Sequence, residues 1–470
     1  MPTTKVNYAL QPWHWRSLPL DNRSASEVFA ALFGDHSIAT LLESPSPSIV
    51  DAQQSHLSRY SICAGDPRTI AGKPRLWTPK LGTVLPWMRS LLSPQPEDTQ
   101  TAHLPFTGGW LGWLGYDLAW EIENLPQLNQ DNLPFPVAYW YEPECFTVLD
   151  HQEQTLWLAV SQIEQLDYLE KKLALETLNH GEPAFIATAS RITFKTDRQQ
   201  YQDAVRQAQQ YIQAGDIFQA NLSLRFQTST TAPSWSIYQQ LQAINPSPFA
   251  SYWRSPWGDV ISCSPERLVQ LSGKQAQTRP IAGTRSRGKT EQGDRALAAE
   301  LLANTKERAE HIMLVDLERN DLGRVCQWGS VEVDELLVIE RYSHVMHLVS
   351  NVKGILQPDC DGIDLIQGVF PGGTITGCPK VRCMEIIEEL EPVGRSLFYG
   401  SCGYLDQRGN LDLNILIRTL LYTKAADSDL AQVYGQVGAG IVADSDPERE
   451  WYESLNKAEA QIAALRSTID

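Results

Sequence analysis

The sequence predicts an α+β fold, in which two antiparallel β-sheets pack as a sandwich surrounded by helices. Three observations support this prediction. Apolar residues recur at helical spacing up to Gly215, after a capping-box pattern formed by Thr196 and Gln199. Two runs, 217–226 and 411–418, alternate apolar and polar residues as β-strands do. Helices and strands follow one another without a regular βαβ rhythm, which favours antiparallel sheets.

The two alternating runs each offer one polar face. In the first run the polar face is formed by Gln219, Asn221, Ser223 and Arg225, opposite a row that begins with Phe218. In the second, Asp412, Asn414 and Arg418 lie opposite an apolar row. Such faces point either into a polar site or to solvent, and the pattern alone allows both.

The chain of 470 residues is long enough for one large domain or two. An amphipathic helix and a polar loop over about 164–191 mark the preferred boundary. We expect an N-terminal region over 1–170 and a second domain over 190–466, in which the sharper motifs lie. The proline-rich stretch 92–105 is expected to be an exposed connection.

Composition excludes several classes of protein. A net charge of −17 argues against a nucleic-acid partner. No apolar run reaches the roughly 18–20 residues that span a bilayer, and no secretory signal is evident. The eight cysteines have no metal-binding spacing and are expected to be reduced, mostly buried thiols of a cytoplasmic protein. In so acidic a chain, an anionic substrate requires a local positive patch or a metal ion.

Two acidic helices could supply a metal site. Glu307 and Glu310 share one helix face, and Glu450, Glu453 and Lys457 share another after a capping-box pattern at Ser445 and Glu448. Carboxylates from separate helices suit a hard cation such as Mg²⁺. Spacing alone favours solvated helix faces with an i,i+4 Glu–Lys pair, because such pairs are common on helix surfaces.

Glycine-rich segments could present backbone N–H groups to a carboxylate. They cover 280–284, 371–380 and 438–440, and the second leads into a helix with Pro379 in its first turn. Ordinary turns are the alternative. None matches a phosphate-binding loop or a dinucleotide motif, so no nucleotide is expected.

Three single residues could carry chemistry. Glu266 would be a general acid if burial raised its pKa, but glutamates are usually exposed. His347, taken alone, is more typical of a core histidine than of a site residue, and Arg418 could face a polar cavity or solvent. The residues alone therefore indicate a globular α+β protein with an anion and metal site.

Together, these segments resemble the chorismate-utilising family over about 196–464. The family includes the large subunits of anthranilate synthase and aminodeoxychorismate synthase, and also isochorismate and salicylate synthases. Segments 41–44 and 108–118 look like the family's N-terminal part. The motifs of the main region lie, in order, at 215–219, 264–267, 280–284, 309–317, 319–323, 377–382, 384–387 and 440–445.

The resemblance implies the anthranilate synthase component I-like chorismate-binding fold and a role for each matching residue. Glu310 and Glu453 would bind Mg²⁺, with Glu307 and Glu450 in support, and the ion would hold and polarise the ring carboxylate of chorismate. Glu266 would protonate the departing C4 hydroxyl. The enolpyruvyl carboxylate would be held by Arg418, Lys457, Gly438, Ala439 and Gly440, and the ring would be lined by His347, Gly283, Thr284 and Thr374.

The position of Gln219 bears on the nucleophile. Water-using members carry a lysine base there, and a neutral amide does not activate water, so the resemblance implies ammonia. The chain has no glutaminase motif, which implies a separate glutaminase subunit. The family often has an aromatic hydroxyl where Phe398 stands, with Tyr399 beside it, and this departure removes one expected contact to the substrate.

Amination could occur at C4 or at C2. Ala282 replaces the lysine of many C4-aminating members and resembles the C2-aminating anthranilate synthases of tryptophan biosynthesis. Thr376, the segment 115–126 and the short chain instead resemble aminodeoxychorismate synthases, which serve 4-aminobenzoate and folate biosynthesis. The balance favours C4 amination.

Two further readings follow from the resemblance. Glu43, Ser44, Pro248 and Phe249 match the tryptophan-binding elements of relatives, although ordinary turns would look the same. A non-catalytic chorismate or tryptophan sensor is a hypothesis of another class, against which the intact set Glu266, Glu310, Glu453 and Lys457 argues.

Overall fold

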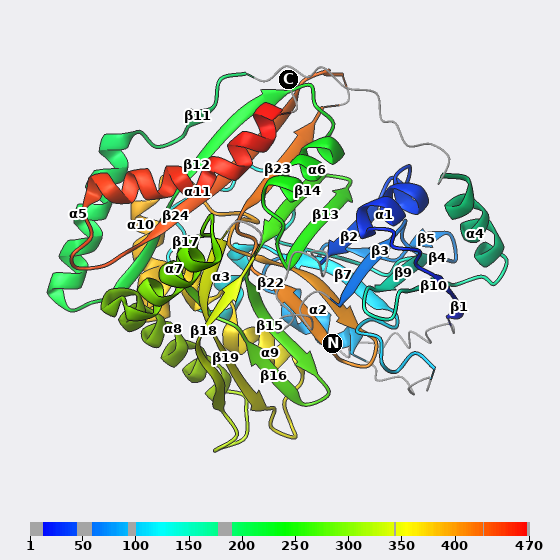
Figure 1. Cartoon of the computed structure of the whole chain (residues 1–470), viewed down its shortest axis with the longest axis horizontal. Helices are drawn as coiled ribbons and strands as arrows, with labels where there is room; N and C mark the ends of the chain where they lie inside the picture. The colour runs from blue at the N-terminus through cyan, green and yellow to red at the C-terminus, as the bar shows by residue number, and fades with distance from the viewer. Residues whose placement is uncertain are drawn as a thin grey trace.

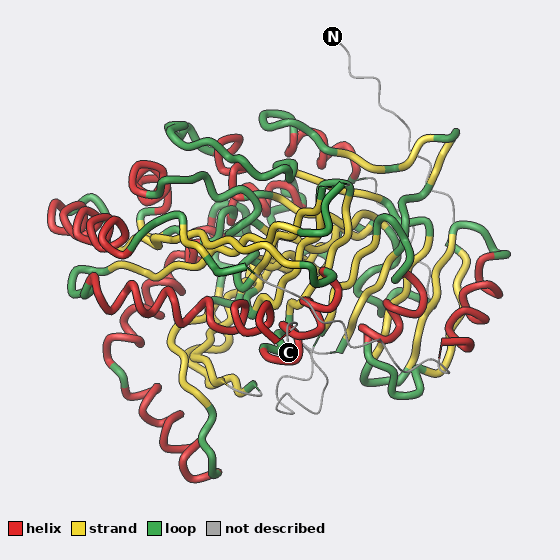
Figure 2. The backbone as a smooth tube through the Cα atoms, turned by 90° about the horizontal axis from the view of Figure 1, so that it is seen from above, coloured by secondary structure: helices red, strands yellow, loops and turns green. Residues whose placement is uncertain are grey.

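A computed structural model of the chain describes residues 13–44, 59–92, 100–176, 190–342, 345–425 and 427–467. Its strands gather in the middle of the molecule and helices surround them (Figure 2). Every strand pair within these ranges is antiparallel. The predicted α+β sandwich of two antiparallel sheets is confirmed.

The larger sheet has twelve strands. Strand β20 (Gly377–Cys378) pairs with β12 off the main path. In spatial order the other strands are β1 (His14–Pro19), β10 (Thr155–Val160), β9 (Cys145–Asp150), β3 (Tyr60–Ala64), β2 (Ala39–Glu43), β13 (Phe249–Ser255), β14 (Gly258–Ser264), β23 (Thr419–Lys424), β24 (Ala431–Ile441), β12 (Gln219–Thr230) and β11 (Thr193–Phe194).

The second sheet has ten strands, of which β18 (Glu332–Arg341) pairs with β19 off the main path. A separate two-strand ribbon joins β4 (Thr69–Ile70) and β5 (Lys73–Pro74). The path of the second sheet is β17 (Ile281–Ser286), β19 (Val345–Ile355), β16 (Gln275–Thr278), β15 (Arg267–Ser272), β22 (Leu411–Asn414), β21 (Ser401–Asp406), β7 (Gly109–Leu114), β8 (Ala138–Tyr141) and β6 (Leu76–Trp77).

Helices cover the sheets on the outside (Figure 1). They are α1 (Ala25–Phe33), α2 (Val84–Leu91), α3 (Ala119–Ile122), α4 (Gln165–Glu176), α5 (Arg198–Ala214), α6 (Ser234–Ile244), α7 (Glu291–Ala303), α8 (Thr305–Gly323), α9 (Gly362–Val369), α10 (Lys380–Leu390) and α11 (Pro447–Ser467), with short 3₁₀ turns η2 (Tyr116–Leu118) and η3 (Gly373–Ile375). No helix of the described ranges has the length and apolarity needed to cross a membrane.

The predicted boundary near 170–190 separates two stretches of chain that contribute strands to both large sheets. Helix α4 lies in the expected amphipathic segment, and the loop after it lies outside the described residues. Part of the stretch 92–105 also lies outside them. Two large apolar clusters fill the interior, one around Trp113, Trp140 and Trp253 and the other around Phe29, Tyr238 and Tyr252.

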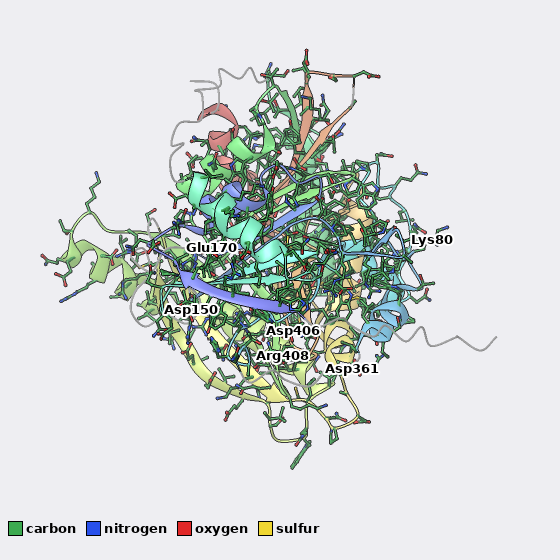
Figure 3. All side chains as sticks on the ribbon, turned by 90° about the vertical axis from the view of Figure 1, so that its right-hand side faces the viewer. Lys80, Asp150, Glu170, Asp361, Asp406 and Arg408 are labelled. Atoms are coloured by element: carbon green, nitrogen blue, oxygen red, sulfur yellow. The ribbon has the colours of Figure 1, made fainter. Side chains whose placement is uncertain are left out.

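Ion pairs connect the outer strands of the larger sheet to neighbouring segments, and Figure 3 labels two of the acidic partners, Asp150 and Glu170. Arg16 on β1 contacts Glu170 on α4 at 2.6 Å, and Arg59 contacts the fully buried Asp150 at 2.8 Å. Exposed pairs of the first kind contribute little stability, so burial of apolar surface dominates here.

Two predicted helix starts are wrong by one residue. The capping box of α5 uses Asp197 and Gln200, and Asp446 accepts the Arg449 N–H at the start of α11. Asp caps at least as well as Thr or Ser, so adjacent candidates compete. Gly215 ends α5 in the left-handed conformation as its position predicts, with φ 83°.

The alternating runs are confirmed in part. In β12 the residues Ala220, Leu222, Leu224 and Phe226 are buried, but Phe218 precedes the strand and is 69% exposed. The run 411–418 forms a strand only to Asn414. Segments 280–284 and 438–440 lie largely within β17 and β24 rather than in turns, and Pro379 is the N-cap of α10 rather than part of its first turn.

Candidate active site

The predicted residues gather where β12, β24, α8 and α11 meet, and where β17 and β19 approach α8. Gln219 opens β12 and is 3% exposed. Its Nε2 atom lies 3.5 Å from Oε1 of Glu310 on α8, and its own Oε1 is buried without a hydrogen-bond partner in the described structure. A neutral amide therefore stands directly beside one of the predicted metal ligands.

Gly440 makes this approach possible. A Cβ at Gly440 would lie 2.5 Å from Nε2 of Gln219 and 3.7 Å from Oε1 of Glu310, so the strand presents bare backbone to the site. Gly438 faces Asn221, where a Cβ would meet Oδ1 at 2.9 Å. Ala439 between them is fully buried in the core, as strand alternation requires. A ligand can therefore contact the glycine backbone at 438 and 440, whereas the side chain of Ala439 is packed in the core and only its backbone could take part.

Helix α11 brings Lys457, Glu453 and Glu450 to the same region. The Nζ atom of Lys457 lies 2.9 Å from Oε1 of Glu453 and donates a hydrogen bond of 3.1 Å to the carbonyl oxygen of Gly438. Glu450 is buried and Glu453 is half-exposed. The predicted helix face is thus turned toward β24, with its lysine tied to the glycine segment.

Glu307 supports the site from one turn earlier in α8. Its Oε1 accepts a 2.8 Å hydrogen bond from Arg285, whereas Oε2 is buried without a hydrogen-bond partner. A Cβ at Gly283 would lie 3.4 Å from that Oε2. Gly283 has φ 75° and sits at a bulge between Ala282 and Thr284, so glycine both fits the backbone and leaves room for the carboxylate.

The four carboxylates of the site are not fully balanced by neighbouring positive charges. Burial raises the pKa of Glu310, and repulsion from Glu453 and Glu307 adds to this shift against the attraction of Lys457. Burial also raises the pKa of Glu450, with Glu453 contributing. Such a set attracts a hard cation.

Within the described ranges, no group of three or more His, Cys, Asp or Glu side chains lies close enough together to hold a metal ion by itself. Mg²⁺ needs few protein ligands, since it usually keeps several waters and is completed by substrate oxygens. The oxygen donors Glu310 and Glu453, with Glu307 and Glu450 beside them, fit that requirement.

Glu266 lies in the turn between β14 and β15 and is 6% exposed. Its N–H donates to the Ser264 hydroxyl at 3.2 Å, and its carbonyl oxygen accepts from the Ile415 N–H at 3.0 Å. Burial raises the pKa of its carboxyl to about 7, partly opposed by the Thr374 hydroxyl of η3. Glu266 is therefore an acid that can hold a proton near neutral pH.

His347 and Thr284 are register partners on β19 and β17. The Thr284 hydroxyl lies 2.9 Å from Nδ1 of His347. Burial, together with the charge of Arg418, lowers the pKa of His347 to about 4. The imidazole is thus neutral at physiological pH, and His344 of the same motif lies outside the described residues.

Arg418 follows the end of β22 in a left-handed backbone conformation, with φ 52°. Its carbonyl oxygen accepts from the Cys263 N–H at 3.1 Å. Burial lowers the pKa of its guanidinium. No carboxylate of the described ranges forms an ion pair with it, so its charge is available to an anion. A turn, not strand alternation, places this residue.

A buried network of hydrogen bonds and ion pairs behind β12 was not predicted from the residue pattern. Arg395 is 2% exposed and donates to both carboxylate oxygens of Glu391, to the Ile375 carbonyl and to the Asn221 carbonyl, at 2.7–3.0 Å. Glu391 also accepts from the Ser223 N–H and hydroxyl at 2.8 Å. The i,i+4 spacing of Glu391 and Arg395 was the available signal. This network fixes β12 against the segment that carries Thr374.

Phe398, which stands where the family often has an aromatic hydroxyl, and its neighbour Tyr399 both have a packing role. Phe398 is buried under the guanidinium of Arg225, 5.4 Å from the ring centroid, and Tyr399 lies under Arg395 at 4.5 Å. Both rings thus pack on buried arginines rather than on the group around Glu266.

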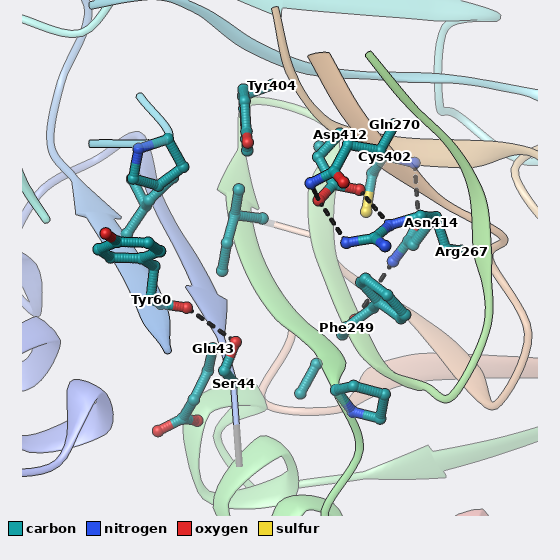
Figure 4. Close-up of a pocket in the computed structure, with 16 residues that line it drawn as sticks. Glu43, Ser44, Tyr60, Phe249, Arg267, Gln270, Cys402, Tyr404, Asp412 and Asn414 are labelled. Carbon is teal, nitrogen blue, oxygen red and sulfur yellow. Dashed lines mark hydrogen bonds and ion pairs between the residues drawn. The ribbon is translucent and has the colours of Figure 1, made fainter. Parts of the chain in front are cut away.

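A separate cavity of about 130 Å³ lies between β2, β13 and the second sheet (Figure 4). Glu43, Ser44, Pro248 and Phe249 all contribute to its wall. The Ser44 hydroxyl donates to the Tyr60 carbonyl at 2.7 Å, and the Glu43 carboxylate turns away to accept from Ser26 and from Tyr238 at 2.6 Å. The opposite wall carries Arg267, Gln270, Tyr404, Asp412 and Asn414.

Comparison with known proteins gives one family. The sequence model of the family described as chorismate binding enzyme matches residues 47–463 of this chain. An anthranilate synthase component I-like protein of Synechocystis is 64% identical, over 97% of this chain and 92% of the relative. Aminodeoxychorismate synthase component 1 of Bacillus subtilis is 45% identical, over 87% and 89%.

Two further relatives help to place the chain. Synechocystis also has an anthranilate synthase component 1, which is 41% identical over 77% of each chain. Among solved structures, anthranilate synthase component I of Streptococcus pneumoniae superimposes with a TM-score of 0.72 at 30% identity, covering 89% of this chain and 98% of that one. The fold of this chain therefore matches that of the anthranilate synthase component I structure.

Proposed function

The chain belongs to the family of chorismate binding enzymes, and we propose that it is the large subunit of an aminodeoxychorismate synthase. In this proposal it aminates chorismate at C4, with ammonia from a separate glutaminase subunit. The product, 4-amino-4-deoxychorismate, is the precursor of 4-aminobenzoate. The observation that carries amination is Gln219 beside Glu310, because an uncharged amide there leaves ammonia as the nucleophile.

The relatives support the choice of C4. Synechocystis has one protein named as anthranilate synthase component 1 and another named only as like it, and this chain shares far more identity with the second. The aminodeoxychorismate synthase of Bacillus subtilis also aligns over more of the chain than that anthranilate synthase does. C2 amination to anthranilate is the alternative, which Ala282 favours.

Charge balance supports binding of a dianionic substrate. Arg418 offers a cation without a carboxylate partner in the described structure, and Lys457 lies at the glycine segment of β24. They would hold the enolpyruvyl carboxylate. Glu310 and Glu453 would hold Mg²⁺, with Glu307 and Glu450 in support. The ion would supply charge for the ring carboxylate of chorismate.

The chain's own groups then act on the C4 oxygen. Glu266, protonated because it is buried, donates its proton to the C4 hydroxyl, which leaves as water. Ala282 carries no nucleophile, so ammonia itself forms the new C–N bond. His347, neutral and oriented by Thr284, lines the ring without adding positive charge.

The test uses the purified full-length chain with chorismate, Mg²⁺ and ammonium salt, which replaces the glutaminase. Chorismate consumption would support the enzyme over a sensor. A product that becomes 4-aminobenzoate only after addition of a lyase supports C4 amination, whereas directly formed fluorescent anthranilate contradicts it. The intact acid Glu266 argues for catalysis, since a sensor has no use for it.

A second proposal concerns the separate cavity. We propose that it binds tryptophan, because the four residues that match tryptophan-binding elements converge on its wall. The aromatic and ionic lining suits an amino acid with an apolar ring. Isothermal titration with tryptophan tests this, and absence of heat at millimolar ligand would contradict it.

A further inference from the structure

Two amide side chains on one face of β12 have carbonyl oxygens without hydrogen-bond partners. They are Gln219, which is 3% exposed, and Asn221, two residues further along the strand. Oε1 of Gln219 and Oδ1 of Asn221 are both buried, and neither accepts a hydrogen bond from any residue that the structure describes. Leaving a buried acceptor unpaired is costly, so these two oxygens require a physical reason.

The amide nitrogens fix the direction of both oxygens. Nε2 of Gln219 lies 3.5 Å from Oε1 of Glu310, and Nδ2 of Asn221 lies 3.4 Å from the carbonyl oxygen of Thr374. Turning either amide over would place its carbonyl oxygen against another oxygen, which is repulsive. The two unpaired oxygens are therefore on the sides of the amides that face away from Glu310 and from Thr374.

The backbone of Asn221 is anchored on both sides. Its N–H donates to the carbonyl oxygen of Thr376 at 2.9 Å, and its carbonyl oxygen accepts from Arg395 at 2.7 Å. Arg395 is itself paired with Glu391 in the buried network behind β12. Asn221 thus holds a fixed position in which only its side-chain oxygen remains for a ligand.

Glycines on the neighbouring strand let both amides lie over bare backbone. Strand β24 pairs with β12 (Figure 1), and Gly438 and Gly440 share the face that carries Gln219 and Asn221. A Cβ at Gly440 would lie 2.5 Å from Nε2 of Gln219, and one at Gly438 would lie 2.9 Å from Oδ1 of Asn221. A side chain at either glycine would displace an amide, so the two strands together position the pair of acceptors.

We propose that Oε1 of Gln219 and Oδ1 of Asn221 bind the ammonia nucleophile, which makes Asn221 a further substrate-binding residue of the site. This inference rests on the proposed use of ammonia and holds for amination at either ring carbon. Acceptors without partners select a ligand that donates hydrogen bonds. Ammonia satisfies both oxygens with two of its N–H groups.

Uncharged acceptors suit a nucleophile better than carboxylates would. A carboxylate stabilises ammonium, whose nitrogen has no lone pair, whereas an amide oxygen can hold neutral ammonia by its N–H groups. The lone pair then stays free to form the C–N bond. For amination at C4, the C–O bond breaks and the hydroxyl leaves as water with the proton of Glu266. The new C–NH₃⁺ group releases one proton, which restores Glu266.

The experiment compares initial rates of chorismate consumption by Asn221→Leu and by the wild type. Both full chains are assayed with Mg²⁺ while ammonium chloride is varied at fixed pH and ionic strength. Loss of one acceptor should raise KM for ammonium about threefold to tenfold, the range of one hydrogen bond. The value of kcat at saturating ammonium and KM for chorismate should stay within about twofold of wild type, because binding that is equal in the ground and transition states changes KM alone.

The matched control is Gln227→Leu, since Gln227 is a partly buried amide on the same face of β12. It should change none of the three constants. If leucine at 221 prevents folding, which circular dichroism would show, Asn221→Ala removes the same acceptor without adding bulk.

An unchanged KM for ammonium in the folded Asn221 variant would overturn the proposal. A rise in KM for chorismate alone would also overturn it, because Asn221 would then contact chorismate. So would a loss of kcat with both KM values unchanged, since that result marks a structural role. Failure of the wild type to consume chorismate would instead overturn the proposed function itself.

Discussion

The ammonium of Lys457 lies 2.9 Å from the carboxylate of Glu453, one helical turn away, and donates to the Gly438 carbonyl. In this arrangement the lysine neutralises a residue that we propose as a metal ligand. A divalent cation at Glu453 and Glu310 would take over that role and leave the lysine charge for a substrate carboxylate. Metal and substrate binding are therefore expected to be coupled.

Mg²⁺ should stabilise the wild-type fold in the absence of substrate. A cation bound only by the native state adds about 2.7 kcal/mol when present at about 100 times its Kd. The measurement is the midpoint of thermal unfolding against MgCl₂ concentration, with NaCl of equal ionic strength as control. Glu453→Gln should lose most of this shift, and an undiminished shift would remove Glu453 from the metal site.

Glu266→Gln should reduce turnover by about 10²–10⁴-fold, the range that a general acid contributes, while chorismate binding persists. Glutamine keeps the size of the side chain but has no acidic proton. Rates with ammonium and titration calorimetry with chorismate separate the two effects.

The control variant is Glu389→Gln, at a glutamate on the surface of α10. A buried glutamate such as Glu142 is less suitable as a control, because it is paired with Arg68 and Arg75.

The pH dependence of kcat/KM should show one alkaline limb. Glu266 must be protonated to act and burial raises its pKa to about 7, so activity falls as pH rises through about 7 at constant free ammonia. His347, with a pKa lowered to about 4, stays neutral across this window. A profile flat from pH 6 to 8.5 would contradict the assignment.

Arg418→Met should raise KM for chorismate about 10–100-fold, because a hydrogen bond to a charged group contributes about 1.5–3 kcal/mol. Arg418→Lys should recover only part of the affinity, since lysine lacks the planar fork. Arg308 on the exposed side of α8 supplies the control Arg308→Met. An unchanged KM in Arg418→Met would place the substrate carboxylates elsewhere.

Arg395→Met should destabilise the fold by about 3–5 kcal/mol, because Glu391 would keep a buried charge without its partner. Urea unfolding measures the change. The exposed pair Arg206–Asp203 provides the comparison, and Arg206→Met should leave stability close to wild type. Equal free energies of unfolding for the two variants would contradict the prediction, because they would mean that water can solvate the Glu391 carboxylate once Arg395 is removed.

The residue pattern predicted what depends on local order. The polar face of β12, the helix faces of Glu307 with Glu310 and of Glu450 with Glu453, and the glycine at 215 all follow from period and capping. The capping residues 197 and 446 were missed by one position because neighbouring side chains cap equally well.

Features that depend on contacts between segments far apart in the sequence were not predictable from local patterns. Glu266 is buried because its turn is hydrogen-bonded to Ile415, some 150 residues later in the chain. Arg418 points from a left-handed turn that alternation does not describe. The cavity around Phe249 joins β13 to β21 and β22, which no local motif connects.

The most direct test of the account is the product formed from chorismate by the purified chain with Mg²⁺ and ammonium. The account predicts a product that yields 4-aminobenzoate after a lyase is added, with no fluorescent anthranilate before it. Anthranilate formed without the lyase would contradict amination at C4.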